Sequence, residues 1–277
     1  MGVRLLPYLF TSARSTAPTS SLFTSSPDMH WPLSPLETAW CAAALAAGYA
    51  VRGVAGFGSG VVATPLLTFV LPLSITAPLI TVIGFFVSVR QAVRDWPLIQ
   101  WRRVAEFIPG SLVGVAIGLY VFKTIDQVAL ARWLGAYILF YAFYSLFGER
   151  LHRRTLSPPH WLIHPVAAVG AIVATIFGGL AGPIYVTWFD SLKLSKSVFR
   201  VTVSTTLLAL NLVRSIGYFA TGVFRFDELA LVAAAFIPVA IGTLVGDRLH
   251  DRLDPRAFRR AIGALLVASG LGLLFIR

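Results

Sequence analysis

Residues 198–220 read VFRVTVSTTLLALNLVRSIGYFA, an apolar stretch long enough to cross a bilayer that nevertheless contains Arg214. At about 1.5 Å per residue, a helix of this length spans the roughly 30 Å hydrocarbon core of a membrane. A guanidinium at that depth costs several kcal/mol unless it lines a protected polar cavity. Asn211 and Ser204 share a helix face with Arg214. We therefore expect this face to handle a solute that crosses the membrane, and an anion is the natural ligand.

The composition is that of a membrane protein. Apolar residues make up 57% of the 277 residues and charged residues 13%, and the mean hydropathy is +0.77. These values exclude an ordinary water-soluble surface. The net charge of +11 does not indicate nucleic-acid binding, because the basic residues form short runs between apolar segments. Their expected partner is the anionic surface of the lipid bilayer. Cys41 is the single cysteine, so no disulfide within the chain and no cysteine metal cluster is expected.

Residues 1–35 are predicted to form a flexible leader rich in Ser, Thr and Pro. Their composition resembles a transit peptide, whereas the apolar patch at 5–10 is shorter than the core of a signal peptide. Met29 is the only other methionine, so an upstream start codon is the alternative. The sequence leaves open whether residues 1–28 belong to the native protein.

From Leu36 onward, apolar segments follow one another with short connections. We expect them at 36–51, 54–71, 75–94, 104–121, 130–147, 165–181, 183–191, 198–220, 228–247 and 258–276. Most are long enough to span a membrane, but 183–191, at about 14 Å, predicts a half-helix or re-entrant piece. The segment 54–71, interrupted by Gly56, Gly58, Gly60 and Pro65, predicts its counterpart. The basic residues concentrate in alternate loops, which favours ten passages of a multi-pass plasma (inner) membrane protein with both termini outside the cytoplasm.

The two halves of the chain resemble each other. Gly114 and Gly118 recur at one constant offset as Gly242 and Gly246, together with five further identities, and Val89-Arg90 recurs as Val213-Arg214. We predict a first transmembrane repeat at 36–147, a basic connecting loop at 148–164 and a second repeat at 165–277. An odd number of passages in each half makes the repeats inverted, as in secondary transporters. The predicted fold is an all-α membrane protein, a polytopic helical bundle of two inverted repeats with about eight full transmembrane helices plus broken or re-entrant segments.

Each half carries a glycine cluster followed by proline. Helix ends that are broken in this way expose N–H groups that can hold an anion, near the midplane between the repeats. The alternative is that the glycines only let helices pack closely. The predicted substrate-binding residues are Arg214, Asn211, Arg90, Gly56, Gly58, Ser59, Gly60, Thr64, Pro65, Gly178, Gly179, Gly182 and Pro183.

These motifs resemble the TauE/SafE sulfite exporter family of membrane permeases. The resemblance rests on the run Gly-Phe-Gly-Ser-Gly…Thr-Pro-Leu-Leu at 56–67, the run Phe-Gly-Gly-Leu-Ala-Gly-Pro at 177–183, Asn211, and the paired Gly-x-x-x-Gly helices at 114–118 and 242–246. It covers nearly everything from residue 40 to the end. The resemblance implies a permease that moves a small anion such as sulfite or an organosulfonate, and the inverted repeats predict that it does so by alternating access. The second half departs from the commoner glycine-rich pattern by placing Leu180-Ala181 between its glycines.

The alternatives to a permease are an intramembrane enzyme, a scaffold and an anion channel. An intramembrane enzyme would need a histidine facing Ser59 in the bilayer, but every histidine lies in a predicted loop or the leader. No zinc-binding pattern occurs, and neither catalysis nor a cofactor is expected. A scaffold would have no use for duplicated broken helices, whereas an anion channel stays open as an alternative.

Arg90 could instead extend to the interface, and Glu106, Asp95 and Asp190 are the acids nearest the membrane. Homo-oligomer formation is also left open.

Overall fold

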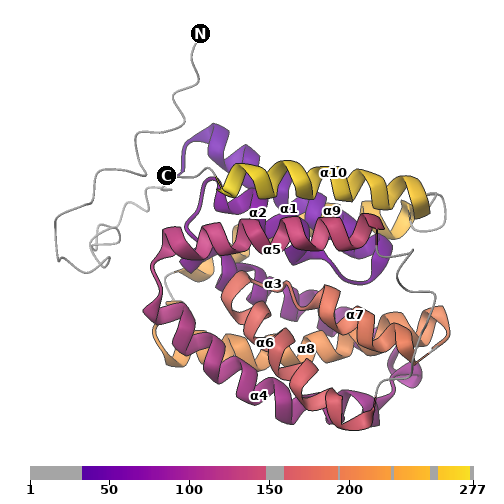
Figure 1. Cartoon of the computed structure of the whole chain (residues 1–277). Coiled ribbons are helices and arrows are strands. Elements are labelled where there is room, and N and C mark those ends of the chain that lie inside the picture. The colour runs from indigo at the N-terminus through magenta and orange to yellow at the C-terminus, as the bar shows by residue number, and fades with distance from the viewer. Residues whose placement is uncertain (1–32, 148–158, 193, 226–227, 250–254, 275–277) are drawn as a thin grey trace. The chain divides into compact units, whose positions relative to one another are not determined.

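The structure is a computed structural model that describes residues 33–147, 159–192, 194–225, 228–249 and 255–274. The chain divides into two units, Met1–Ser34 and Pro35–Arg277, and all the described helices belong to the second. The predicted leader and most of the basic connecting loop lie outside the described residues. The described helices are α1 (Pro35–Ala55), α2 (Ser59–Thr68), α3 (Leu73–Arg94), α4 (Trp101–Thr124), α5 (Gln127–Phe147), α6 (Ile163–Phe177), α7 (Gly182–Ser191), α8 (Lys196–Ala220), α9 (Leu229–Leu249) and α10 (Pro255–Leu274), with short 3-10 turns at Trp96–Leu98 and His160–Leu162 (Figure 1).

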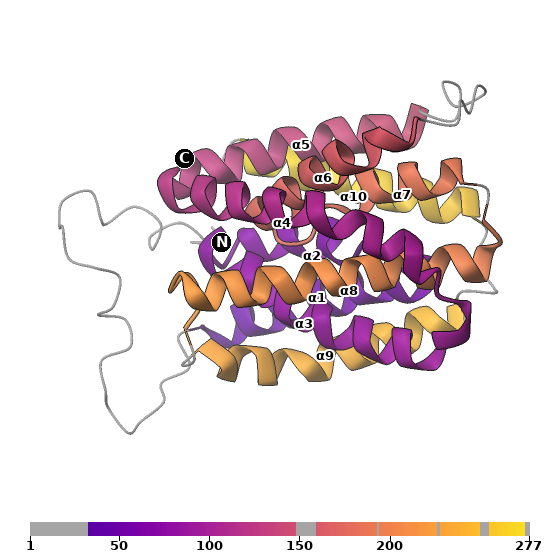
Figure 2. The same ribbon diagram turned by 90° about the horizontal axis from the view of Figure 1, so that it is seen from below.

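The all-helical membrane fold predicted from hydropathy is confirmed for the described residues. Five helical stretches are long and apolar enough to cross a membrane: Leu73–Arg94, Trp101–Thr124, His160–Phe177, Ser197–Ala220 and Leu229–Leu249. The long helices run alongside one another (Figure 2). Large apolar side chains such as Tyr120, Phe140 and Ile237 are exposed on the outside of the bundle. Such a surface is suited to lipid rather than to water.

The short helices α2 and α7 confirm the prediction of two half-length segments. Each has ten residues, so each spans about 15 Å, or half of the hydrocarbon core. Each forms an antiparallel hairpin with the helix before it, because Trp40 Nε1 donates to the Leu66 carbonyl at 2.8 Å and the Tyr185 hydroxyl donates to the Ala167 carbonyl at 2.9 Å. We call residues 56–60 and 178–181 the tips of these two hairpins.

The cause of the breaks differs in part from the prediction. Gly56 and Gly58 have φ values of 82° and 94°, and Gly178 and Gly179 have 69° and 103°, a region that favours glycine. Gly60 and Pro65, predicted to interrupt their segment, instead lie inside α2. Neighbouring helices can satisfy the carbonyl that a proline leaves unpaired within a membrane helix. The glycines with positive φ therefore break the chain, and the prediction for Gly60 and Pro65 was wrong.

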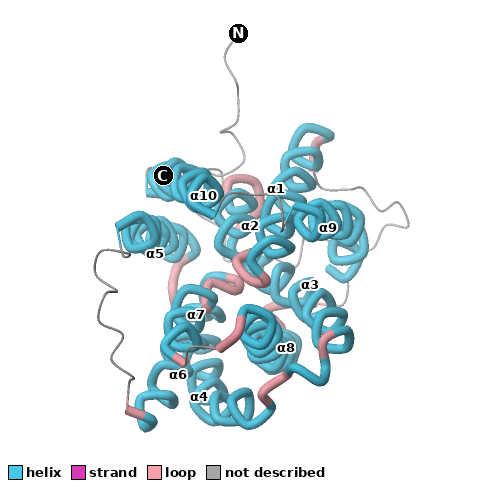
Figure 3. The backbone as a smooth tube through the Cα atoms, turned by 90° about the vertical axis from the view of Figure 1, so that its right-hand side faces the viewer, coloured by secondary structure: helices cyan, strands magenta, loops and turns pink. Residues whose placement is uncertain are grey.

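Four helices of the first half of the chain each pack against a helix of the second half. α4 packs along α6 and α9 packs along α1, while α3 pairs with α8 and α5 pairs with α10 (Figure 3). The repeated glycines make the first two pairings possible. A methyl group on Gly114 would collide with the Ala168 carbonyl of α6, and one on Gly242 would collide with the Ala46 carbonyl of α1. Equivalent glycines thus serve equivalent contacts, as small residues do between membrane helices. The repeat boundaries themselves stay a prediction.

Candidate functional site

A small polar cavity lies where the two hairpin tips meet α3 and α8. We call it the central cavity, and its volume is about 20 Å³. It is lined by Arg52, Gly58, Ser59, Gly60, Ile80, Gly84, Ala174, Gly179, Leu207, Leu210, Asn211 and Arg214. The tips touch beside it, since a Cβ on Gly60 would lie 2.8 Å from the Gly178 carbonyl oxygen. Thr64 also donates to that carbonyl at 3.3 Å and so joins the two hairpins.

Arg214 is fully buried in the wall of the central cavity. Its Nη1 donates to Asn211 Oδ1 at 3.2 Å and its Nη2 donates to the Tyr218 hydroxyl at 3.3 Å. The Tyr218 hydroxyl in turn donates to the Thr175 carbonyl of α6, so the orientation of the guanidinium is tied to two helices. The Nε atom has no partner among the described residues. Because a guanidinium has five N–H donors, donors remain for a ligand.

Arg52 is a second buried arginine of the same cavity, and it is absent from the residues predicted for the site. Only 5% of it is exposed, and its Nη2 donates to Ser88 Oγ at 2.5 Å and to Ser204 Oγ at 3.5 Å. Hydropathy predicts a first segment that ends at residue 51 and so places Arg52 among the loop charges. α1 in fact continues to Ala55. The sequence signal that could have located Arg52 is Gly56, which follows it by about one helical turn and marks the start of the hairpin tip.

The electrostatics of the central cavity favour an anion. Two arginines line it, and no carboxylate is among the lining residues that the structure describes. The first turn of α2 begins at Ser59 beside the cavity. The N–H groups of a first turn have no partner within their own helix and carry a partial positive charge. Two buried cations and a helix N-terminus would repel one another unless a negative charge is held between them.

The structure brings six of the predicted site residues together. Gly58, Ser59, Gly60, Gly179, Asn211 and Arg214 line the central cavity. The others have different places. Gly56 packs against the Arg200 side chain, Gly182 lies beside Phe57, and Thr64 and Gly178 hold the tips together. Pro65 is buried within α2. Pro183 begins α7, and its side chain is outside what the structure describes.

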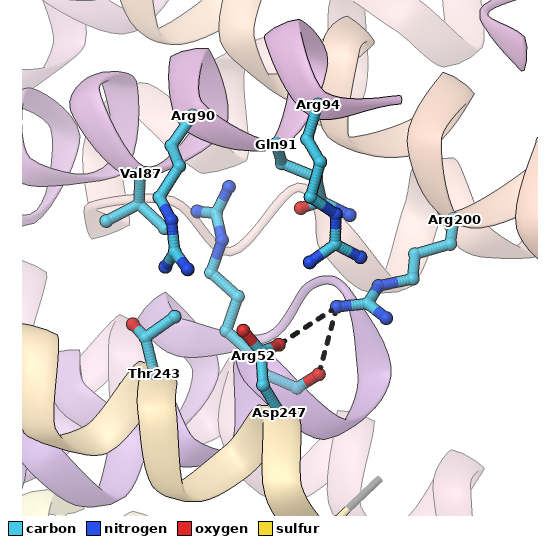
Figure 4. Close-up of a pocket in the computed structure, with 9 residues that line it drawn as sticks. Arg52, Val87, Arg90, Gln91, Arg94, Arg200, Thr243 and Asp247 are labelled. Atoms are coloured by element: carbon cyan, nitrogen blue, oxygen red, sulfur yellow. Dashed lines mark hydrogen bonds and ion pairs between the residues drawn. The ribbon is translucent and has the colours of Figure 1, made fainter. Parts of the chain in front are cut away.

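Arg90 lines a different cavity, which we call the arginine cavity. Its volume is about 30 Å³, and its walls are formed by Arg52, Gly53, Val87, Arg90, Gln91, Arg94, Arg200, Thr243 and Asp247 (Figure 4). Arg200 Nη2 donates to Asp247 Oδ1 and to the Gly53 carbonyl, both at 3.2 Å. Arg52 is a wall residue of both cavities. The two cavities are therefore neighbours that share the Arg52 side chain.

The acids closest to the membrane do not line either cavity. Glu106 forms ion pairs with Arg102 and Arg103, at 3.3 and 3.2 Å. Asp95 pairs with Arg94 at 3.3 Å, and Asp190 is exposed. Their expected role as interface charges suits these positions.

Comparison with known proteins identifies the family. The chain matches the family described as sulfite exporter TauE/SafE over residues 40–273. The chain belongs to the TauE/SafE family. This TauE/SafE protein is similar to the probable inner membrane transporter protein TsaS of Comamonas testosteroni, with 29% identity over 185 residues, 63% of this chain and 72% of TsaS. No solved structure matches it. The chain is a multi-pass membrane transporter of the plasma membrane, and the resemblance seen in its motifs is confirmed.

Proposed function

We propose that the protein moves a small anion across the plasma membrane and holds it in the central cavity. One observation carries this proposal: Arg52 and Arg214 share a buried cavity that has no carboxylate among its described lining residues. A buried charge without a partner costs several kcal/mol. An anion that binds between the two guanidinium groups would offset that cost, and this gives the cavity an affinity for negative charge.

The donor groups suit an oxyanion. Guanidinium groups form paired hydrogen bonds with the oxygens of sulfur and carbon acids. The Asn211 amide and the Ser59 hydroxyl add uncharged donors, and the first-turn N–H groups of α2 lie beside them. Sulfite or an organosulfonate fits this set, with a negatively charged group that has several oxygens. The family description, which names sulfite, supports the same substrate class.

Alternating access is the mechanism that the geometry favours. At about 20 Å³, the central cavity has space for about one or two water molecules. An oxyanion needs the walls to separate, and the tips, which are in contact at Gly60 and Gly178, form part of those walls. Movement of one hairpin away from the other would open it to one side of the membrane. A carrier of this kind differs from an anion channel, which keeps a continuous pore.

Counterflow in proteoliposomes tests the proposal. Vesicles loaded with unlabelled sulfite should transiently accumulate labelled sulfite from outside, and sulfate, sulfonates and carboxylates are screened in the same way. A carrier shows this accumulation because one binding site is presented alternately to each side. Arg102→Ala is the matched control, since Arg102 is an exposed arginine at a helix end with 91% of its side chain accessible. Flux without counterflow would indicate a channel, and absence of flux for every anion would refute the proposal.

A further inference from the structure

The arginine cavity corresponds to the central cavity in the internal repeat. Val87 and Arg90 of α3 stand at the positions that Asn211 and Arg214 occupy in α8, at the offset that relates Val89-Arg90 to Val213-Arg214. α3 and α8 pack against each other. Arg90 and Arg214 nevertheless line different cavities. The repeat thus places an arginine at corresponding points of two neighbouring cavities.

We propose that the arginine cavity is a second binding site for the transported oxyanion, from which the central cavity is filled or into which it empties. This inference rests on the proposed function. It assigns to Arg52, the residue common to both cavities, the role of passing the anion between them. The cavity lies at the ends of helices that the distribution of basic residues predicts to face the cytoplasm.

The charge of the arginine cavity favours this role. Four arginines line it, namely Arg52, Arg90, Arg94 and Arg200, against the single carboxylate of Asp247. Arg90 and Arg94 extend from α3 and Arg200 from α8 toward the space above Arg52 and Asp247 (Figure 4). The Asp247 carboxylate already forms an ion pair with Arg200. Arg94 pairs with Asp95, which lies outside the cavity wall, so Arg52 and Arg90 are left without an acid among the described wall residues.

Unpaired polar atoms indicate what kind of ligand is expected. Arg52 Nε, Arg200 Nε and Gln91 Nε2 are buried without a hydrogen-bond partner among the described residues. Each of these atoms is a donor, and leaving a buried donor unpaired costs about 1–3 kcal/mol. Arg52 as a whole is only 5% exposed. Three unpaired donors on residues that line one cavity favour a ligand rich in acceptors, and an oxyanion supplies several acceptors together with negative charge.

The phosphate of an anionic lipid shares this chemistry, because Arg90 and Arg94 are exposed at the helix end. Equilibrium dialysis with ³⁵S-labelled sulfite distinguishes the two ligands. The full chain is placed in nanodiscs of zwitterionic phosphatidylcholine, and the binding is repeated after phosphatidylglycerol is added. We expect two sulfite equivalents in both lipids. Loss of one equivalent when phosphatidylglycerol is present would assign the cavity to lipid and overturn the inference.

Variants assign each equivalent to a cavity. Arg90→Ala combined with Arg94→Ala should bind one equivalent and raise the KM for sulfite at least about fivefold. Arg214→Ala should also bind one equivalent, at the arginine cavity. Arg248→Ala, which removes an exposed arginine next to Asp247, should bind two. Thermal unfolding of each variant checks that the protein is folded, and Arg90→Gln replaces the double variant if that protein is unstable.

The outcomes separate this inference from the proposed function. A wild-type protein that binds one equivalent and transports sulfite would overturn the second site and leave the proposed function intact. Two equivalents in the Arg90→Ala/Arg94→Ala variant would do the same. A wild-type protein that neither binds nor transports sulfite would refute both for this anion.

Discussion

Arg52 and Asn211 approach each other across Gly84. A Cβ on this glycine would lie 2.9 Å from Asn211 Nδ2 and 3.8 Å from Arg52 Nη1, so a methyl group here would collide with the Asn211 amide. α1 and α8 supply the two side chains, and α3 has no side chain at the point between them. Glycine at this position therefore lets the Asn211 amide and the Arg52 guanidinium lie close to the backbone of α3, in the wall of the central cavity.

Gly84→Ala should therefore weaken anion binding without removing a charge. The added methyl group would push the Asn211 amide out of its place in the cavity wall, so the amide would donate less well to the ligand. We expect a KM for sulfite raised by about tenfold, equivalent to one charge-assisted hydrogen bond of roughly 1.5 kcal/mol. Ala92→Ser is a control for α3, since Ala92 is buried but lines neither cavity. Unchanged transport kinetics in Gly84→Ala would place the anion elsewhere.

Substitutions of Arg214 distinguish charge from hydrogen-bond geometry. Arg214→Ala loses both and should reduce transport roughly 10- to 100-fold, the equivalent of about 1.5–3 kcal/mol. Arg214→Lys keeps the charge but loses the planar fork and should be impaired less, as should Asn211→Ala. Sulfite-induced shifts in melting temperature are measured beside transport. A folded Arg214→Ala protein that keeps the wild-type number of sulfite equivalents and the wild-type affinity would remove Arg214 from the site.

Gly60→Ala should hold the hairpin tips apart. The methyl group would lie 2.8 Å from the Gly178 carbonyl oxygen and 3.0 Å from the Gly179 backbone, so it would collide with the second hairpin. We expect slow transport and faster reaction of a cysteine placed by Ser59→Cys, in a Cys41→Ser background, with a water-soluble thiol reagent. Gly242→Ala crowds α9 against α1 instead, so it should lower the melting temperature without increasing this reaction. Equal labelling rates with and without Gly60→Ala would contradict closure by the tips.

Asp247→Asn should strengthen sulfite binding at the arginine cavity. The carboxylate now accepts from Arg200 at 3.2 Å and competes with an anion for that guanidinium. Removing its charge should lower the Kd of this equivalent severalfold. The side chains of Arg200 and Asp247 are 22% and 27% exposed, so the ion pair itself contributes about 1 kcal/mol or less. Melting temperature should change little. Weaker binding in Asp247→Asn would show that Asp247 supports the site instead of competing with it.

Cysteine labelling tests the predicted orientation. In a Cys41→Ser background, Arg102→Cys should react only with reagents that reach the cytoplasm, and Lys123→Cys should react from outside. These residues lie at opposite ends of α4, whose 24 residues span about 36 Å. Labelling of Lys123→Cys from the cytoplasm would show that the bundle has the opposite orientation, with the arginine cavity on the outer side.

The sequence determined the features that depend on neighbouring residues. Apolar length located the membrane helices, and α8 runs from Lys196 to Ala220 where 198–220 was expected. The ten-residue helix at 182–191 was expected from its short apolar run. The face shared by Asn211 and Arg214 followed from helical spacing alone, and Arg214 Nη1 does donate to Asn211 Oδ1. These results are local, because helix geometry fixes which residues within one segment lie together.

Only the tertiary structure decided which distant residues share a cavity. Arg52 joins Arg214 because the tips of two hairpins meet between α3 and α8, a contact that no local pattern encodes. Arg90 and Arg214 were both predicted to bind the substrate, yet they line different cavities: Thr243 and Asp247 of α9 complete the wall around Arg90, whereas Ala174 of α6 and the two hairpins complete the wall around Arg214. Pro65 suggested a break, but positive φ at the glycines makes the break while α2 continues through the proline. Packing between segments far apart in the chain sets these outcomes, and hydropathy does not contain that information.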